Sequence, residues 1–133
     1  ASAALTEAGA KRCIPLVVSG PFHSIYLKEA GAKLREYMKD VTFNELQLPY
    51  ITNVTATYVS DSDEIPALLE KQVSSSVRWQ QSVETMISDG VDTFIEIGPG
   101  KTLAGFIKKI DREVKVINVS CVEDLENVKE LAK

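Results

Sequence analysis

The hydrophobic positions of this chain fall into short continuous runs, separated by stretches in which apolar residues recur at helical spacing. The run at 13–18 has the length and apolar character of a strand that is buried on both faces. Further strands are predicted at 48–54, 93–97 and 114–119. The alternation of such runs with amphipathic stretches predicts an α/β fold.

Helices are predicted where apolar residues repeat at steps of three and four. The longest spans about 24–41, with Leu27, Leu34 and Met38 on its apolar face. Another follows the polar turn at 60–63 and has Pro66 in its first turn. The other predicted helices cover 3–11, 79–90, 102–110 and 122–132, and the pattern indicates one compact unit without repeats or linkers.

Composition narrows the class of protein. A hydrophobic fraction of 44% and a charged fraction of 26% over 133 residues are typical of a soluble globular domain. The net charge of −4 comes from intermixed acids and bases, which argues against a nucleic-acid partner, and no apolar run is long enough to span a membrane. Cys13 and Cys121 lie far apart, so neither a zinc site nor a disulfide framework is indicated, and a cytoplasmic location is expected.

The only histidine, His23, is the first candidate for chemistry. It follows a predicted buried strand and the Gly20-Pro21 break, and it opens a long helix. Residues between a strand and a helix lie at the carboxyl edge of the sheet, where α/β proteins place their active sites, and imidazole transfers protons near neutral pH. From spacing alone, however, a surface or helix-capping histidine is the favoured interpretation.

The strand, glycine turn and helix start around Gly98-Pro99-Gly100 form a second candidate. Backbone amides at such a helix N-terminus can bind phosphate. The segment matches neither the Walker pattern, which needs four residues before its Gly-Lys pair, nor the dinucleotide pattern, because position 103 is leucine. A tight strand–helix connection is the favoured interpretation.

For three weaker candidates, the sequence favours a structural role over a chemical one. The spacing of Asp61, Asp63 and Glu64 does not match a calcium loop, which favours a solvated turn. Trp79 and Phe106 lie on helical stripes and are predicted to belong to the core. No serine lies in a G-x-S-x-G elbow anywhere in the chain.

Three segments, in this order, resemble malonyl-CoA:acyl-carrier-protein transacylases. PLVVSGPFHS at 15–24 resembles the segment that holds the family's active-site histidine. LEKQVSSSVRW at 69–79 resembles the family's Q-x-x-x-P-V-x-W stretch, with Ser76 in place of the proline. GVDTFIEIGPGKTL at 90–103 resembles the E-x-G-P-G-x-x-L signature. The resemblance covers about 13–120 and is specific as a set.

The resemblance implies an enzyme that transfers malonyl from malonyl-CoA to the phosphopantetheine thiol of acyl carrier protein, in fatty-acid biosynthesis. His23 would be the general base and acid of a serine–histidine dyad that forms a malonyl-serine intermediate. The main-chain carbonyl of Gln72 would orient the ring, so the side chain at this position is expected to matter little. Phe22 would crowd out an α-methyl branch in the substrate pocket. No cofactor or metal is implied beyond the two substrates.

The departures from the family concern the rest of the site. The G-H-S-x-G elbow, the arginine for the malonyl carboxylate and the oxyanion-hole segment have no counterpart here. The chain also begins with Ala1 rather than an initiator methionine, and the helix predicted at 3–11 follows directly. We therefore expect a C-terminal piece that is inactive without the missing N-terminal portion of the same enzyme.

The resemblance also implies a division of the chain. Residues 1–18 would be the last helix and strand of a ferredoxin-like small subdomain. Residues 19–133 would be the C-terminal part of the large, α/β-hydrolase-like subdomain of an acyltransferase. Two alternatives stay open: the acyltransferase domain of a polyketide synthase, and a non-catalytic module that binds phosphate at the Gly98-Pro99-Gly100 turn.

Overall fold

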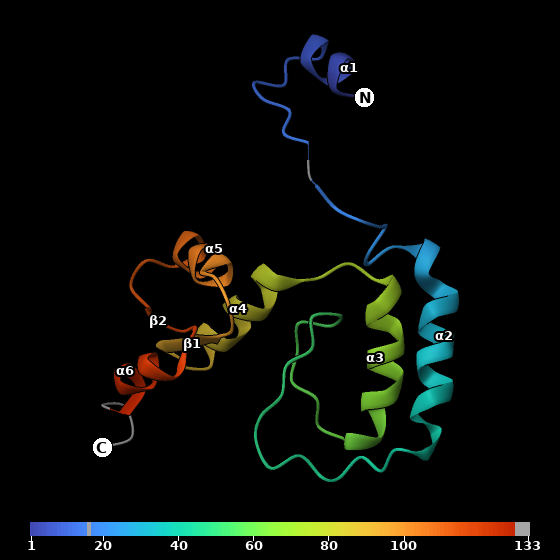
Figure 1. The fold of residues 1–133 in the computed structure, drawn as a ribbon, viewed down its shortest axis with the longest axis vertical. Helices are drawn as coiled ribbons and strands as arrows, with labels where there is room; N and C mark the ends of the chain where they lie inside the picture. The colour runs from blue at the N-terminus through green and yellow to red at the C-terminus, as the bar shows by residue number, and fades with distance from the viewer. Residues whose placement is uncertain (16, 130–133) are drawn as a thin grey trace.

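The chain folds into two groups of elements, with an N-terminal helix set apart from both. A computed structural model describes residues 1–15 and 17–129. Figure 1 shows α2 and α3 packed side by side in one group, and α4, β1, α5, β2 and α6 in the other. The bounds are α1 Ser2–Glu7, α2 Lys28–Tyr37, α3 Ile65–Ser74, α4 Trp79–Ser88, β1 Thr93–Ile97, α5 Thr102–Ile110, β2 Lys115–Val119 and α6 Glu126–Lys129.

The second group is a parallel β-α-β unit built on a small apolar core. β1 pairs with β2 so that Phe94 lies opposite Val116, and the inward side of this pair meets α4 and α5. Val83 of α4 and Ile107 of α5 close the core around Phe94, and Trp79 packs against it as predicted. The predicted elements at 93–97 and 102–110 are confirmed with the same bounds, and the strand predicted at 114–119 begins one residue later.

The opposite face of β1 and the outer side of α5 are open in this chain. Ile95 and Ile97 are 40% and 81% exposed. The prediction that Phe106 belongs to the core is wrong, because α5 presents its ring to solvent, where the Lys109 Nζ lies 5.7 Å from the ring centroid. Among the described residues β1 pairs with β2 alone, so its other edge is unpaired.

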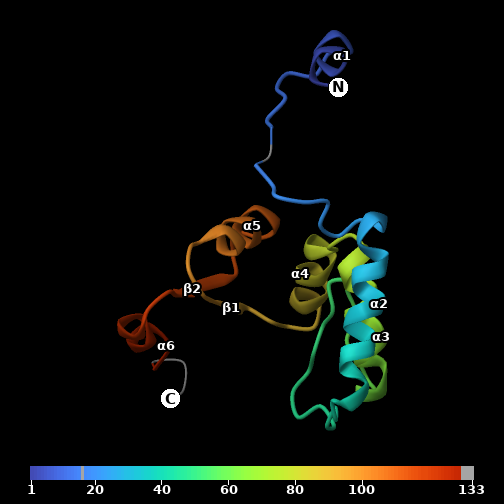
Figure 2. The same cartoon turned by 45° about the vertical axis from the view of Figure 1, so that its right-hand side comes forward.

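α2 and α3 pack closely where Gly31 meets Glu70. Gly31 is buried, and a Cβ at this position would lie only 2.7 Å from the Glu70 carbonyl oxygen. This approach brings the beginning of α2 against the end of α3, as Figure 2 also shows. The helix predicted at 24–41 is confirmed. It consists of α2 with a 3₁₀ turn on each side, at Ile25–Leu27 and Met38–Asp40.

The strand predicted at 48–54 is wrong. Ile51 makes a single antiparallel bridge to Tyr58, and the chain between them turns through Ala56 at a φ of 59°. Thr85 of α4 donates its hydroxyl hydrogen to the Ala56 carbonyl at 2.9 Å. The run at 48–54 therefore belongs to a loop in which Thr52 and Val54 are buried, and it forms no sheet ladder.

The strand predicted at 13–18 is also wrong. None of its described residues joins a ladder, and Ile14, Val17 and Val18 are 63%, 105% and 68% exposed. The segment connects α1 with the turn before α2 and lies away from β1 and β2 (Figure 1). No strand of the described chain is near enough to pair with this segment. Its apolar residues therefore form no strand here.

The first and last helices are shorter than the sequence predicts. α1 ends at Glu7, short of the bound predicted at 11. A 3₁₀ turn at Val122–Leu125 leads into α6, and 130–132 of the predicted last helix lie outside the described residues. No helix in the part that the structure describes has the length and apolarity to cross a membrane. Cys13 and Cys121 are both free.

Candidate active site

His23 lies in a tight turn that leads into α2. Its backbone has a φ of 56°, a left-handed conformation that costs a non-glycine residue about 1–3 kcal/mol. Ser24 Oγ donates to the Pro21 carbonyl at 2.6 Å across the turn, and Leu27 N donates to the Ser24 carbonyl at 3.0 Å. These bonds hold the strained turn, and such strain is concentrated at functional sites.

The ring of His23 hydrogen-bonds to the end of α3. Its Nδ1 lies 3.0 Å from the main-chain oxygen of Gln72, although 49 residues separate the two positions. The carbonyl is available because α3 ends at Ser74, and carbonyls in the last turn of a helix lack an intrahelical amide. Among the described residues, the backbone amide that approaches the Gln72 oxygen is that of Ser75, at a long 3.4 Å.

This contact determines which ring nitrogen can accept a proton. When Nδ1–H donates to a carbonyl oxygen, the neutral ring keeps its lone pair on Nε2. Among the described residues none hydrogen-bonds Nε2. In the part of the chain that the structure describes, the ring is therefore held by main chain, without a carboxylate partner.

Phe22 adjoins His23 but is not enclosed by this chain. Its side chain is 63% exposed, and its ring packs against the backbone of Gly20, where a Cβ would lie 3.6 Å from the ring. A substrate pocket at Phe22 would therefore need walls from outside the described residues. Its role in excluding a branched acyl group stays a prediction.

The Gly98-Pro99-Gly100 turn is closed by a carboxylate from within the chain. Glu96 accepts hydrogen bonds from the Leu103 amide at 3.1 Å and the Ala104 amide at 2.8 Å, at the first turn of α5. Asn118 donates from Nδ2 to the same carboxylate at 2.8 Å. These hydrogen bonds hold the pKa of Glu96 below its ordinary value. The bond from the Ala104 amide contributes most, followed by those from Asn118 and the Leu103 amide.

This geometry explains the glycines and argues against a phosphate site. Gly98 and Gly100 have φ angles of 136° and 95°, in the region that favours glycine. Two amides at the start of α5 are already bonded to an anionic side chain, which occupies the position that a phosphate would need. The turn is therefore a self-capped strand–helix connection.

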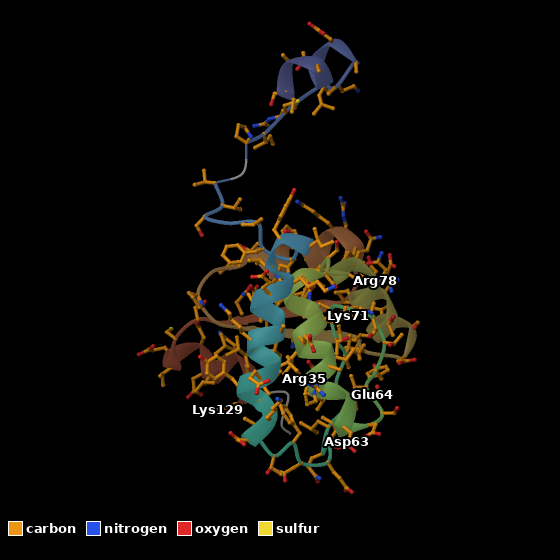
Figure 3. All side chains as sticks on the ribbon, turned by 90° about the vertical axis from the view of Figure 1, so that its right-hand side faces the viewer. Arg35, Asp63, Glu64, Lys71, Arg78 and Lys129 are labelled. Carbon is orange, nitrogen blue, oxygen red and sulfur yellow. The ribbon has the colours of Figure 1, made fainter. Side chains whose placement is uncertain are left out.

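The acidic group at the start of α3 forms a cap rather than a metal site. Asp61 Oδ1 accepts a hydrogen bond from the Asp63 amide at 2.8 Å. Asp63 and Glu64 lie where α3 begins, whereas Lys71 lies toward the other end of the helix (Figure 3). In the described chain no three His, Cys, Asp or Glu side chains gather in a way that could bind a metal ion.

A concavity near the C-terminal end of the described chain does not mark the candidate site. It has a volume of about 860 Å³ and lies along β2 and α6, where its lining includes Lys115, Asn118 and Lys129. His23 belongs instead to the α2–α3 group, in which a smaller hollow of about 260 Å³ lies between Lys28 and Lys71. An open concavity beside an exposed sheet is an expected consequence of unpaired strands, not a sign of chemistry.

Sequence reasoning missed two polar side chains that shape these sites. Asn118 bonds both the Glu96 carboxylate and the Gly100 carbonyl, the latter at 3.2 Å. The one signal for it was a polar residue within the apolar run of β2. The side-chain amide of Gln72 also approaches the histidine, with Nε2 3.4 Å from Nδ1. Helical periodicity gives no signal for such a contact.

Comparison with known proteins gives a consistent result. No family model matches the chain. The malonyl CoA-acyl carrier protein transacylase of Bacillus subtilis (strain 168) is 45% identical over 126 residues, which are 95% of this chain and 40% of that relative. The crystal structure of a malonyl CoA-acyl carrier protein transacylase from Clostridium perfringens superposes with a TM-score of 0.87 at 40% identity, covering 98% of this chain and 41% of that one.

A third comparison involves a complex. A malonyl-transacylase bound to a type II PKS acyl-carrier protein superposes with a TM-score of 0.87 at 33% identity, over 97% of this chain and 42% of that one. The chain thus spans about 40% of the length of the relatives that it matches. By sequence and by fold, this chain matches malonyl CoA-acyl carrier protein transacylases over about two fifths of their length.

Proposed function

We propose that this chain supplies the histidine of a site that transfers malonyl from malonyl-CoA to the phosphopantetheine thiol of acyl carrier protein. The observation that carries the proposal is the His23 Nδ1 contact with the Gln72 carbonyl, which leaves Nε2 as the basic nitrogen. The relatives at 45% and 40% identity are named for this transfer. Fatty-acid synthesis is the pathway that we propose for it.

The proposed chemistry has two half-reactions. Nε2 of His23 takes the proton of a serine hydroxyl as the serine oxygen attacks the malonyl thioester carbon. The imidazolium then protonates the departing CoA sulfur, and a malonyl-serine ester remains. In the second half-reaction the same nitrogen takes the proton of the phosphopantetheine thiol, whose sulfur displaces the serine oxygen, and the proton passes to that oxygen.

The serine is proposed to come from polypeptide outside this chain. No G-x-S-x-G elbow occurs in the sequence, and the relatives are about 2.5 times as long as the matched segment. The accessible surface of 10330 Å² exceeds the roughly 6,900 Å² expected for a compact protein of 14.6 kDa. The open face and unpaired edge of β1 fit this excess, since further strands would cover them.

The division into subdomains is likewise a proposal. α1 lies apart from the other elements at the end of a long connecting segment (Figures 1 and 2), as expected if residues 1–18 pack on a neighbouring subdomain. Residues 19–133 would then complete a larger α/β subdomain. The segment at 13–18 would find its strand partners only there.

Two alternatives are weaker on these observations. A phosphate-binding module is disfavoured because Glu96 already occupies the start of α5. An acyltransferase domain of a polyketide synthase shares the same proposed chemistry. The two possibilities differ in the carrier protein that accepts malonyl. Measuring kcat/KM for carrier proteins from both pathways would distinguish them.

The test of the proposed function is His23→Ala in the complete polypeptide that contains this segment. Malonyl-CoA and a phosphopantetheinylated carrier protein are supplied, and malonyl carrier protein is measured. A general base contributes about 10²–10⁴-fold to such a rate, so a loss of this size is expected. A matched Gln80→Ala variant on the exposed start of α4 should retain the parent rate. Transfer by His23→Ala at the parent rate would overturn the proposal.

A further inference from the structure

Ser24 precedes the 3₁₀ turn Ile25–Leu27 as its N-cap residue, but its hydroxyl does not cap that turn. A serine at an N-cap normally accepts a hydrogen bond from a backbone amide two or three residues further on. Here the side chain makes no such bond. Its Oγ instead donates backwards, to the Pro21 carbonyl at 2.6 Å. The hydroxyl therefore stabilises the turn that contains His23 rather than the helical segment that follows it.

The turn needs this bond because of the residue at its third position. Residues 21–24 form a four-residue turn in which His23 is third and has a φ of 56°. Turns with a positive φ at the third position favour glycine or asparagine there, since a larger side chain is strained. The bond from Ser24 to Pro21 joins the last residue of the turn to the first. It therefore opposes relaxation of His23 to a negative φ.

The backbone conformation of His23 determines which group its ring meets. With a φ of 56°, the ring reaches the end of α3, and its Nδ1 lies 3.0 Å from the Gln72 main-chain oxygen. A negative φ would turn the Cα–Cβ bond in another direction and lengthen this contact. The Gln72 side-chain amide, 3.4 Å from Nδ1, can donate to it only in the tautomer protonated on Nε2. Loss of the carbonyl contact therefore favours that tautomer, in which Nε2 cannot accept a proton.

We propose that Ser24 is a positioning residue, whose hydroxyl holds His23 in the left-handed conformation that directs Nδ1–H at the Gln72 carbonyl and leaves Nε2 basic. Ser24 acts through His23 and needs no contact with substrate. The inference rests on the proposed function, because the orientation of the ring affects malonyl transfer only if Nε2 of His23 is the base.

The test uses the complete polypeptide and two variants that differ from each other by one hydroxyl. Ser24 has an extended backbone, with φ −129° and ψ 163°, which suits a β-branched residue. Ser24→Thr keeps the hydroxyl, and Ser24→Val has nearly the same shape without it. Ser24→Ala also removes the hydroxyl and replaces Ser24→Val should that variant not fold. Ser88→Ala is the matched control, because Ser88 Oγ donates to the Thr85 carbonyl, three residues back, at 2.8 Å at the end of α4.

The expected result has a spectroscopic and a kinetic part. Histidine labelled with ¹⁵N in the ring reports the tautomer, and the His23 signals are assigned by their disappearance in His23→Asn. In Ser24→Val the share of the Nε2-protonated tautomer rises. Its kcat falls about tenfold with KM for malonyl-CoA unchanged, as part of the roughly 10²–10⁴-fold that a positioned base contributes. Ser24→Thr and Ser88→Ala match the parent in both measurements.

The inference and the proposed function fail in different ways. A folded Ser24→Val or Ser24→Ala variant with the parent's tautomer ratio or the parent's kcat overturns the inference. A Ser24→Thr variant as impaired as Ser24→Val also overturns it, because the hydroxyl would then not be the group that matters. Transfer by His23→Ala at the parent rate would instead overturn the proposed function, while the tautomer ratio of Ser24→Val does not depend on activity.

Discussion

Nδ1 of His23 and the main-chain oxygen of Gln72 lie 3.0 Å apart, joining the turn before α2 to the last turn of α3. A histidine oriented in this way needs no acidic residue to set its tautomer. Its orientation depends instead on backbone geometry at two places. One is the left-handed turn at His23, and the other is the point at which α3 stops.

The strained turn predicts a difference between two substitutions of the same residue. His23→Ala and His23→Gly both remove the ring, so both should abolish proton transfer. Glycine adopts a φ of 56° without the steric penalty that alanine has, which is about 1–2 kcal/mol. Urea denaturation of the complete polypeptide should therefore show His23→Gly as the more stable variant. Equal stabilities would mean that the turn relaxes when the ring is lost.

Glu96 predicts a loss of stability in acid. Hydrogen bonds from the Ala104 amide, Asn118 and the Leu103 amide hold the pKa of this carboxyl below its ordinary value. The ionised form therefore stabilises the fold above the unfolded-state pKa of about 4.3, and this contribution disappears as pH falls through the lower folded-state pKa. Glu96→Gln should lower the urea midpoint at pH 7 and flatten its dependence on pH below about 4.3.

A control separates this effect from a general change of charge. Glu113 is exposed in the loop before β2. Glu113→Gln should keep both the midpoint and the acid dependence of the parent. An acid dependence in Glu96→Gln as steep as the parent's would assign the acid sensitivity to other carboxyl groups.

The open face of β1 predicts opposite effects in the short chain and in the complete polypeptide. Ile97 is 81% exposed here, and burying such a side chain contributes about 1.5–3 kcal/mol. Ile97→Lys should reduce self-association of the isolated chain in size-exclusion chromatography, but lower the melting temperature of the complete polypeptide. Ala32→Lys on the exposed side of α2 is the control and should change neither. A complete polypeptide that tolerates Ile97→Lys would show that this face stays open.

Phe22 predicts the acyl selectivity of the complete enzyme. If its ring excludes an α-methyl branch, Phe22→Ala should raise kcat/KM for methylmalonyl-CoA relative to malonyl-CoA. One methyl group in a pocket is worth about 1–3 kcal/mol, which corresponds to roughly tenfold or more in the ratio. Competition between the two thioesters measures that ratio directly. An unchanged ratio would place the selecting residue elsewhere.

The elements that local sequence determines were predictable. β1, α5 and β2 follow each other closely, and the core residues Phe94 and Ile107 recur at the spacing of a strand and a helix. Their bounds follow from that spacing and from the glycine turn between them. The contact between His23 and Gln72 could be expected only from the resemblance to a family, since no periodic pattern relates positions 49 residues apart.

The failures of prediction concern apolar runs whose partners are not local. The runs at 13–18 and 48–54 have strand composition, but a strand also needs a neighbouring edge with free amides and carbonyls. Thr52 and Val54 are buried within a loop instead, and Ile14, Val17 and Val18 remain exposed to solvent. The roles of Asn118 and of the Gln72 amide depend on side-chain geometry across the fold, which composition does not encode.

The central claim is that this chain contributes the base of the malonyl-transfer site but not its nucleophile. Its most direct test is peptide mapping by mass spectrometry of the complete polypeptide, quenched in acid shortly after mixing with malonyl-CoA. The malonyl ester should lie on a serine outside residues 1–133, and His23→Ala should fail to form it on the same timescale. A malonyl ester on a residue of this chain, or loading of His23→Ala at the parent rate, would contradict the claim.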